Sequence, residues 1–119
     1  MNELKTSTDM ITAARREGDA IFATVLGEVD LSNSPELRVG LLELIQIKPP
    51  KRLILNLAAV PYMDSSAIAV LVETLKKLRV GGGKMVLLSL QPRVKGLLEI
   101  ARLDSIFPVA KDEVDALTK

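Results

Sequence analysis

The stretch LILNLAAVPYMDSSAIAVLVETLKKLRV, residues 53–80, decides the fold of this protein. It begins with a short apolar run, Leu53–Leu57, that shows no helical period and is therefore typical of a buried strand. From about Ser65 to Val80 the apolar side chains return with helical spacing, and the glycines at 81–83 end the pattern. The polar residues around Asp64 lie between the two. The stretch predicts a strand, a loop and a helix.

The residues before this unit predict a hairpin and another helix. Ile11–Arg16 and Ala20–Glu28 are strand-like runs joined by a turn at 17–19, which is typical of an antiparallel pair. A helix is expected to begin with Ser34 as its N-cap and Pro35 as its first residue. Its apolar stripe consists of Leu37, Leu41, Leu44 and Ile45.

The residues after this unit repeat the alternation. Lys84–Leu90 predicts a buried strand, Pro92 opens a helix, 104–110 contains a short strand, and 111–119 predicts a terminal helix. Alternating strands and helices favour parallel pairing, and the leading hairpin makes the sheet mixed. We expect one α/β domain, residues 1–119, with four to five strands. The third helix should bury Val94, Leu97, Leu98 and Ala101 on one face.

The composition excludes several kinds of site. The chain has 119 residues, no Cys and no His, which excludes a Ser-His-Asp triad, a thiol nucleophile and a Cys or His zinc site. A net charge of +1 and 3% aromatic residues give no basis for a nucleic-acid partner. No apolar leader is visible in residues 1–15, and Asp64 interrupts the longest apolar segment, 53–72. We expect a cytoplasmic protein without direct membrane insertion, and no metal or cofactor.

Polar side chains gather where the central strand meets its helix. Asp64, Ser65 and Ser66 follow a strand and open a helix, and Asp30 follows a neighbouring strand at the same edge of the sheet. The N–H groups and positive dipole at a helix start favour a phosphate. Capping the helix explains the same residues, but one carboxylate or hydroxyl suffices for that. Some of these groups are therefore left for another role.

The helical wheel of residues 65–80 adds a second feature. Opposite the apolar side, Ala69 and Val70 form a small apolar step beside Ser66, ahead of the charged residues. Such a step suits a docking surface, while a neighbouring helix or loop that covers Val70 is the alternative. The apolar side itself consists of Ile68, Leu71, Val72, Leu75 and Leu78.

Four segments together resemble a known family. GEVD at 27–30, MDSSAIAVL at 63–71, GGGKMVLLSL at 81–90 and LDSIFPV at 103–109 are similar, in order and spacing, to the STAS domain of anti-sigma factor antagonists. The resemblance covers nearly the whole chain and implies a mixed sheet with helices mainly on one face. It implies as partners a serine kinase that is itself an anti-sigma factor, and a serine phosphatase that resets the switch.

The resemblance also assigns residues. The phosphorylated serine of the family falls on Ser65 and the acid of its first loop on Asp30, while Ala67 and Ala69 stand where the family commonly has glycine. Ser65 would be the kinase's substrate, and we expect that the chain itself is not an enzyme and has no catalytic residue. The expected partner-binding residues are Asp30, Asp64, Ser65, Ser66, Ala69 and Val70.

Two other functions compete with this one. In the first, the chain is an enzyme in which Asp30, Asp64 and the serines hold Mg²⁺ for phosphoryl chemistry, because hard cations prefer oxygen ligands. Against it, the chain has no P-loop. In the second, the chain is an adaptor subunit of a transporter, a lipid-transport complex or a sensory complex, which resembling domains also serve.

Overall fold

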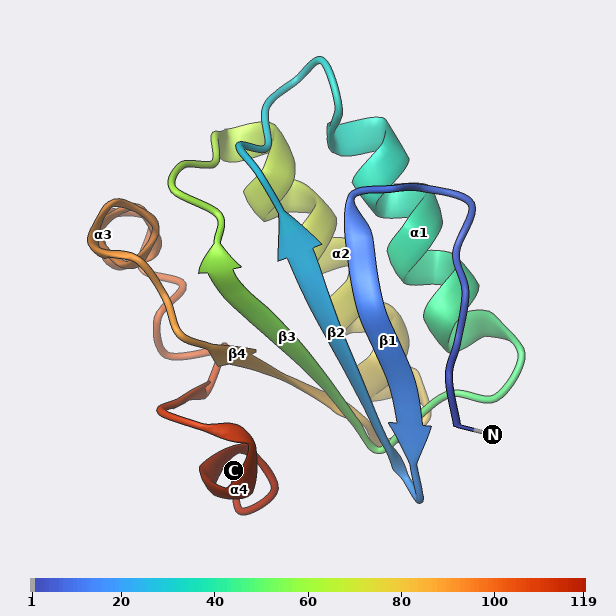
Figure 1. Ribbon diagram of the computed structural model, residues 1–119. Coiled ribbons are helices and arrows are strands. Elements are labelled where there is room, and N and C mark those ends of the chain that lie inside the picture. Colours follow the sequence, from blue (N-terminus) through green and yellow to red (C-terminus); the bar gives the residue numbers. More distant parts are fainter. Residues whose placement is uncertain (1) are drawn as a thin grey trace.

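The computed structural model of the protein describes residues 2–119, which form a five-stranded mixed sheet and four helices (Figure 1). The strands lie in the order β1-β2-β3-β4-β5; β1 and β2 are antiparallel, and the other neighbours are parallel. The predicted mixed α/β fold is confirmed. The elements are β1 Ile11–Glu17, β2 Ala20–Leu26, α1 Ser34–Gln46, β3 Arg52–Ala59, α2 Ser65–Val80, β4 Lys84–Leu88, α3 Pro92–Ile100, β5 Val109–Ala110 and α4 Glu113–Ala116.

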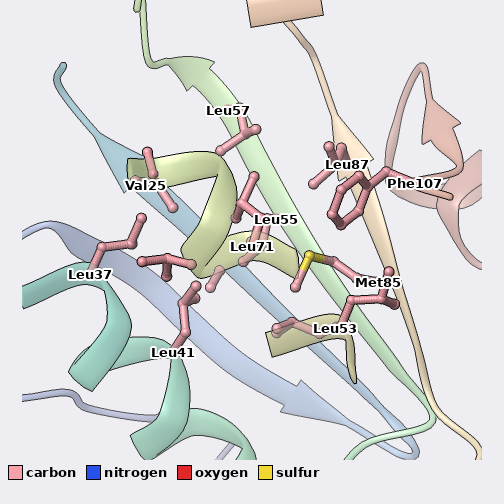
Figure 2. Packing of buried hydrophobic residues seen from close by; sticks show 14 of the residues in the cluster. Val25, Leu37, Leu41, Leu53, Leu55, Leu57, Leu71, Met85, Leu87 and Phe107 are labelled. Atoms are coloured by element: carbon pink, nitrogen blue, oxygen red, sulfur yellow. The ribbon is translucent and has the colours of Figure 1, made fainter. Parts of the chain in front are cut away.

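The main core lies between one face of the sheet and three helices. Alternate residues of β3, Leu53, Leu55 and Leu57, belong to this core together with Met85 and Leu87 of β4 (Figure 2). In Figure 1, α1 and α2 run side by side along this face. The predicted placement of helices mainly on one face is confirmed. The helices contribute Leu37 and Leu41 from α1, Leu71 and Leu75 from α2, and Val94 and Leu98 from α3.

The opposite face of the sheet is covered by α4 and one arginine. Ala116 of α4 packs with Phe22 and Ile54 in a separate, smaller cluster. The guanidinium of Arg15 lies 4.3 Å from the centre of the Phe22 ring and forms an ion pair of 2.7 Å with Glu113 at the start of α4. The cation over the ring buries this aromatic side chain and joins β1 to the end of the chain.

Three local predictions are corrected by the structure. The N-cap of α1 is Asn33, and Ser34 is buried inside the first turn. Strand β4 ends at Leu88, because Ser89 takes a left-handed backbone conformation with a φ of 60° that the pleat cannot continue. Ala101 lies beyond the last helical residue of α3 and is exposed, so it does not join the buried face.

The topology brings two loops to one edge. Strands β2 and β3 are parallel neighbours, so the segments that follow them, residues 27–33 and 60–64, leave the sheet at the same edge. Each segment then turns into a helix, α1 or α2 respectively. This is the edge of the sheet at which the sequence predicts the polar residues to lie.

Candidate functional site at the start of helix α2

Backbone hydrogen bonds join the two loops directly. The N–H of Val29 donates to the carbonyl of Tyr62 at 3.1 Å, and the N–H of Asp64 donates to the carbonyl of Val29 at 3.1 Å. Val29 and Met63 pair as an isolated parallel bridge, and both side chains are buried. The expectation that the loops of Asp30 and Asp64 open at the same edge is confirmed, and the bridge extends the sheet by one step to hold them together.

Asp64 is the N-cap of α2 and also fastens the neighbouring loop. Its Oδ1 accepts hydrogen bonds from the N–H of Ser66 at 2.9 Å, the N–H of Ala67 at 3.3 Å and the hydroxyl of Ser66 at 2.5 Å. Its Oδ2 accepts one from the N–H of Leu31 at 3.1 Å. The capping interpretation of Asp64 is thus confirmed, and the carboxylate also bridges two loops.

These donors favour the charged form of the carboxylate. The hydroxyl of Ser66, together with the N–H groups of Ala67, Ser66 and Leu31, lowers the pKa of Asp64 below its ordinary value, although partial desolvation acts in the opposite direction. Asp64 is therefore ionised at neutral pH. One fixed negative charge lies at the helix start, where the dipole favours it.

The two serines have different roles in the structure. Ser66 is half-buried, and its hydroxyl is committed to Asp64. Ser65 is exposed as the first residue of α2, and its side chain is not among the groups that bond Asp64. The cap is complete without it. Of the two hydroxyls, the one at residue 65 is presented outward.

Asp30 organises the first loop. Its Oδ1 accepts the N–H of Ser32 at 2.8 Å and the hydroxyl of Ser32 at 2.5 Å, while its own N–H donates to Oδ1 of Asn33 at 2.9 Å. Asn33 in turn donates from Nδ2 to the carbonyl of Glu28 at 3.0 Å. Each of these bonds restricts the backbone of residues 28–33, so the loop presents a defined surface next to α2.

The predicted apolar step beside Ser66 is only half present. Val70 is 7% exposed and belongs to the main core, on a helix that packs alongside α1. Of the two interpretations of Val70, the exposed one is wrong and the covered one is confirmed, whereas its neighbour Ala69 is exposed as expected. Ala67 is fully buried. Of the two alanines at family glycine positions, only Ala69 faces the solvent.

The expected supply of free N–H groups at the helix start is also smaller than predicted. The N–H groups of Ser66 and Ala67 donate to Asp64 and are not held out toward a ligand. A phosphate placed on Ser65 would meet an ionised carboxylate beside it rather than an empty cradle. The helix dipole remains favourable for it, but the specific donors are occupied.

One exposed residue of this edge was missed by the sequence reasoning. Leu31 is 75% exposed and lies next to Asp64 through the bond from its N–H. The available signal was a leucine in the otherwise polar segment EVDLSNS, residues 28–34. The link itself joins residues 33 positions apart in sequence and could not be read from local pattern.

Two features typical of other kinds of site are missing from the described residues. Within residues 2–119, no group of three or more acidic side chains lies close enough to hold a metal ion. No helix of that part of the chain combines the length and the apolar character needed to cross a membrane. Both carboxylates at the edge, those of Asp30 and Asp64, are instead bonded to hydroxyl and N–H groups.

Comparison with known proteins gives the family. The family model of the STAS domain matches residues 11–116. The chain belongs to the STAS domain family. It is 33% identical over 99 residues to the anti-sigma F factor antagonist of Paenibacillus polymyxa, covering 83% of this chain and 85% of the relative. It is 34% identical over 103 residues to the anti-sigma-B factor antagonist of Listeria monocytogenes, covering 87% and 90%. These relatives place this STAS domain among the anti-sigma factor antagonists.

Solved structures agree on the fold. An anti-sigma factor antagonist from Mycobacterium paratuberculosis superposes with a TM-score of 0.78 and 25% identity, over 96% of this chain and 97% of that one. At lower identity, 19 to 20%, the same STAS fold is found in the phosphorylated form of Bacillus SpoIIAA and in a sulfate transporter family protein from Wolinella succinogenes, with TM-scores of 0.66 and 0.72.

Proposed function

We propose that this protein is a phosphorylation-switched anti-sigma factor antagonist of the cytoplasm. In its unphosphorylated form it binds an anti-sigma factor serine kinase and frees the sigma factor held by that kinase. Phosphorylation of Ser65 ends the binding, and a serine phosphatase restores it. The observation that carries the proposal is the outward hydroxyl of Ser65 at the start of α2, left free by a cap that Asp64 and Ser66 complete.

The chemistry of the switch belongs to the partner. The chain has neither His nor Cys, so it offers no side chain of near-neutral pKa to activate a serine. In the kinase, the Ser65 oxygen attacks the γ-phosphorus of ATP, the bond to the ADP oxygen breaks, and a base of the kinase takes the hydroxyl proton. Mg²⁺ also comes from the kinase site. Ser65 is a substrate, and its requirement is exposure.

The effect of the phosphate on the interface is electrostatic. Phosphorylation adds about −1.5 to −2 charge at one point. A partner carboxylate ~6 Å away, at an effective dielectric near 20, repels each unit of charge by about 3 kcal/mol. For the dianion this is a loss of roughly ten-thousandfold in affinity as an upper limit.

Within the chain the same charge changes little. The phosphate adds a charge beside ionised Asp64, while the cap that holds the helix start stays in place. The exposed position lets water and ions screen the two charges from each other. The domain therefore remains folded as in the unphosphorylated form, and the switch acts by local repulsion of the partner.

The binding surface follows from the exposed and half-exposed residues of this edge. Val70 is excluded because it is buried in the main core. Asp64 and Ser66 contribute mainly by holding the surface in shape, because their polar atoms bond each other. The proposed partner-binding residues are Asp30, Asp64, Ser65, Ser66 and Ala69.

The adaptor alternative shares the fold, so the fold alone does not choose between them. The transporter-family structure resembles this chain at 20% identity, which concerns architecture. The two antagonists match at 33 and 34% identity over most of both chains, including the segment that carries Asp64 and Ser65. This similarity favours the antagonist.

The direct test is phosphate transfer in vitro. Wild type, Ser65→Ala and Ser66→Ala are incubated with MgATP and, in turn, each anti-sigma factor kinase of the source organism, followed by intact mass and peptide mapping. We expect one phosphate, on residue 65, in wild type and in Ser66→Ala, and none in Ser65→Ala. A phosphate on Ser66, or no transfer from any of these kinases, would contradict the proposal.

A further inference from the structure

Leu31 is an apolar side chain exposed on a restrained loop. It is 75% exposed, yet its backbone neighbours are fixed on both sides by the bonds of Asp30, Ser32 and Asn33. An exposed leucine on a mobile loop gives up conformational freedom when a partner binds it, which lowers affinity. Here the backbone part of that ordering is already present in the free protein. Leu31 is therefore pre-organised for contact.

The residue that fixes Leu31 is the one that precedes the switch serine. The N–H of Leu31 donates to Oδ2 of Asp64 at 3.1 Å, while Oδ1 of the same carboxylate caps α2. Ser65 directly follows Asp64, and consecutive Cα atoms lie about 3.8 Å apart. The backbone of Ser65 is therefore close to the residue that holds Leu31. Through Asp64, the position of the leucine is tied to the position of the serine.

The size of a protein interface brings Leu31 under any partner that reaches Ser65. A specific interface covers about 800 Å² on each partner, a disc of roughly 16 Å radius. A kinase centred on Ser65 therefore covers the Leu31 loop, and burying a leucine side chain that is 75% exposed in the free protein contributes binding energy through the apolar area removed from water. The loop around it is acidic, with Glu28 exposed and Asp30 half-exposed.

We propose that Leu31 is the apolar anchor of this protein for its anti-sigma factor kinase, and that Asp64 acts as a positioning residue for it. The inference rests on the proposed function. The complementary surface of the kinase is an apolar socket, with a basic side chain opposite exposed Glu28 and the repelling carboxylate opposite Ser65. Through this socket the kinase distinguishes this antagonist from chains that have a polar residue at the same place.

Two variants distinguish the contribution of the Leu31 side chain from the contribution of Asp64 to its position. Leu31→Ala removes the side chain and keeps the N–H that Asp64 binds. Asp64→Asn keeps an oxygen for the three donors of the cap but turns an NH₂ group toward the N–H of Leu31. It therefore removes the side-chain bond to Leu31 and keeps the backbone bonds that join the two loops. The control is Val80→Ala, because Val80 is an apolar residue that is 91% exposed at the other end of α2.

Binding is measured by calorimetry between the full-length variants and the ADP-loaded kinase that phosphorylates the wild type. We expect Leu31→Ala to weaken binding by about tenfold to a hundredfold, as for loss of a buried leucine, with Val80→Ala unchanged. Asp64→Asn should weaken it less. If the two substitutions acted independently, the fold losses in affinity of the single variants would multiply in the double variant. We expect a smaller loss than that product, because Asp64 can no longer position the Leu31 side chain once that side chain has been removed. In the kinase assay, Leu31→Ala should raise KM and leave kcat unchanged.

The outcomes are distinguishable. If no kinase of the source organism binds or phosphorylates the wild type, the proposed function fails and the anchor fails with it. If the wild type binds and Leu31→Ala binds equally well, the anchor alone is wrong. If the effects of Leu31→Ala and Asp64→Asn simply multiply, Asp64 does not position Leu31. Faster exchange of the Leu31 amide hydrogen in Asp64→Asn checks that the link was broken.

Discussion

The two ends of helix α2 are closed by different means. At the start, one carboxylate, that of Asp64, accepts the free N–H groups of the first turn. At the end, the helix is closed by glycines. The N–H groups of Gly81 and Gly83 donate to the carbonyl of Leu78 at 3.1 and 2.8 Å, and Gly82 has a φ of 80°, which residues with a side chain rarely adopt. One end is made of polar side chains, the other of bare backbone.

The difference decides which end can carry a function. A glycine end satisfies the carbonyls but offers no group to a partner, and Gly83 fits against the carbonyl of Pro50 so closely that it excludes even a methyl group. A carboxylate has a second oxygen that the cap does not use and that can bond another segment. Asp64 caps the helix with one oxygen, holds the Leu31 loop with the other and leaves the Ser65 hydroxyl outside. Four predictions test this division, from the largest effect to the smallest.

The largest effect is expected at the glycine end. A Cβ on Gly83 would lie 2.7 Å from the carbonyl oxygen of Pro50, a contact that requires the backbone to move. Gly83→Ala should therefore cost about 3 kcal/mol of unfolding free energy, measured by urea denaturation. Gly81→Ala is the control, since its Cβ meets nothing closer than 3.9 Å and its φ is −95°. Equal losses in both would show that steric fit is not the cause.

The next effect concerns binding at the carboxylate end. Ser65→Asp adds one unit of charge where the phosphate would be, so we expect the affinity for the kinase to fall by up to about a hundredfold at low salt. Raising the salt concentration should reduce the loss, because screening weakens the repulsion. Tight binding of Ser65→Asp, equal to wild type, would refute the charge mechanism, and Ser65→Asn serves as the neutral control.

A smaller effect is a pH-dependent contribution of Asp64 to stability. Its pKa is lowered in the folded protein, so the carboxylate stabilises the fold fully above its ordinary pKa of 3.8 and loses this contribution as the pH falls through the lower folded value. The stability difference between wild type and Asp64→Ala should be largest near neutrality and shrink below about pH 4. Urea midpoints at several pH values measure it. A difference that grows in acid would contradict the cap geometry.

The smallest effect on stability is expected at the serine itself. Ser65 is exposed and takes no part in the cap, so Ser65→Ala should change the unfolding free energy by no more than about 0.5 kcal/mol. Thermal unfolding measures it, with Ser66→Ala as the contrast, because that change removes a hydroxyl bonded to Asp64. If Ser65→Ala were the more destabilising variant, residue 65 would be a structural residue.

The sequence was sufficient where the determinants are local. The bounds of α2, Ser65–Val80, follow from a cap and three glycines that lie within a few residues of the helix ends. The alternation of strands and helices gave the mixed sheet for the same reason. The apolar stripes of Leu37, Leu41 and Leu71 were predicted from helical spacing and are buried.

The sequence was insufficient where residues far apart in the chain determine the structure. A helical wheel places Val70 on the polar side of α2, but it contains no information on how the rest of the chain packs against the helix, and Val70 is buried in the main core. Ser34 and Asn33 are both common N-cap residue types, but the side chain of Asn33 makes no capping bond to α1 and bonds to the loop instead, which the local sequence does not reveal. Which serine is free depends on where the Asp64 carboxylate points, which sequence does not give.

In the proposed mechanism, Ser65 switches partner binding without altering its own domain. The measurement is the affinity of the kinase for unphosphorylated protein and for protein carrying one phosphate on Ser65, with amide spectra of both forms. The account predicts a loss of at least a hundredfold, approaching ten-thousandfold at low salt, with spectral changes confined to residues near the start of α2 and the Leu31 loop. Equal affinities, or changes throughout the core, would contradict it.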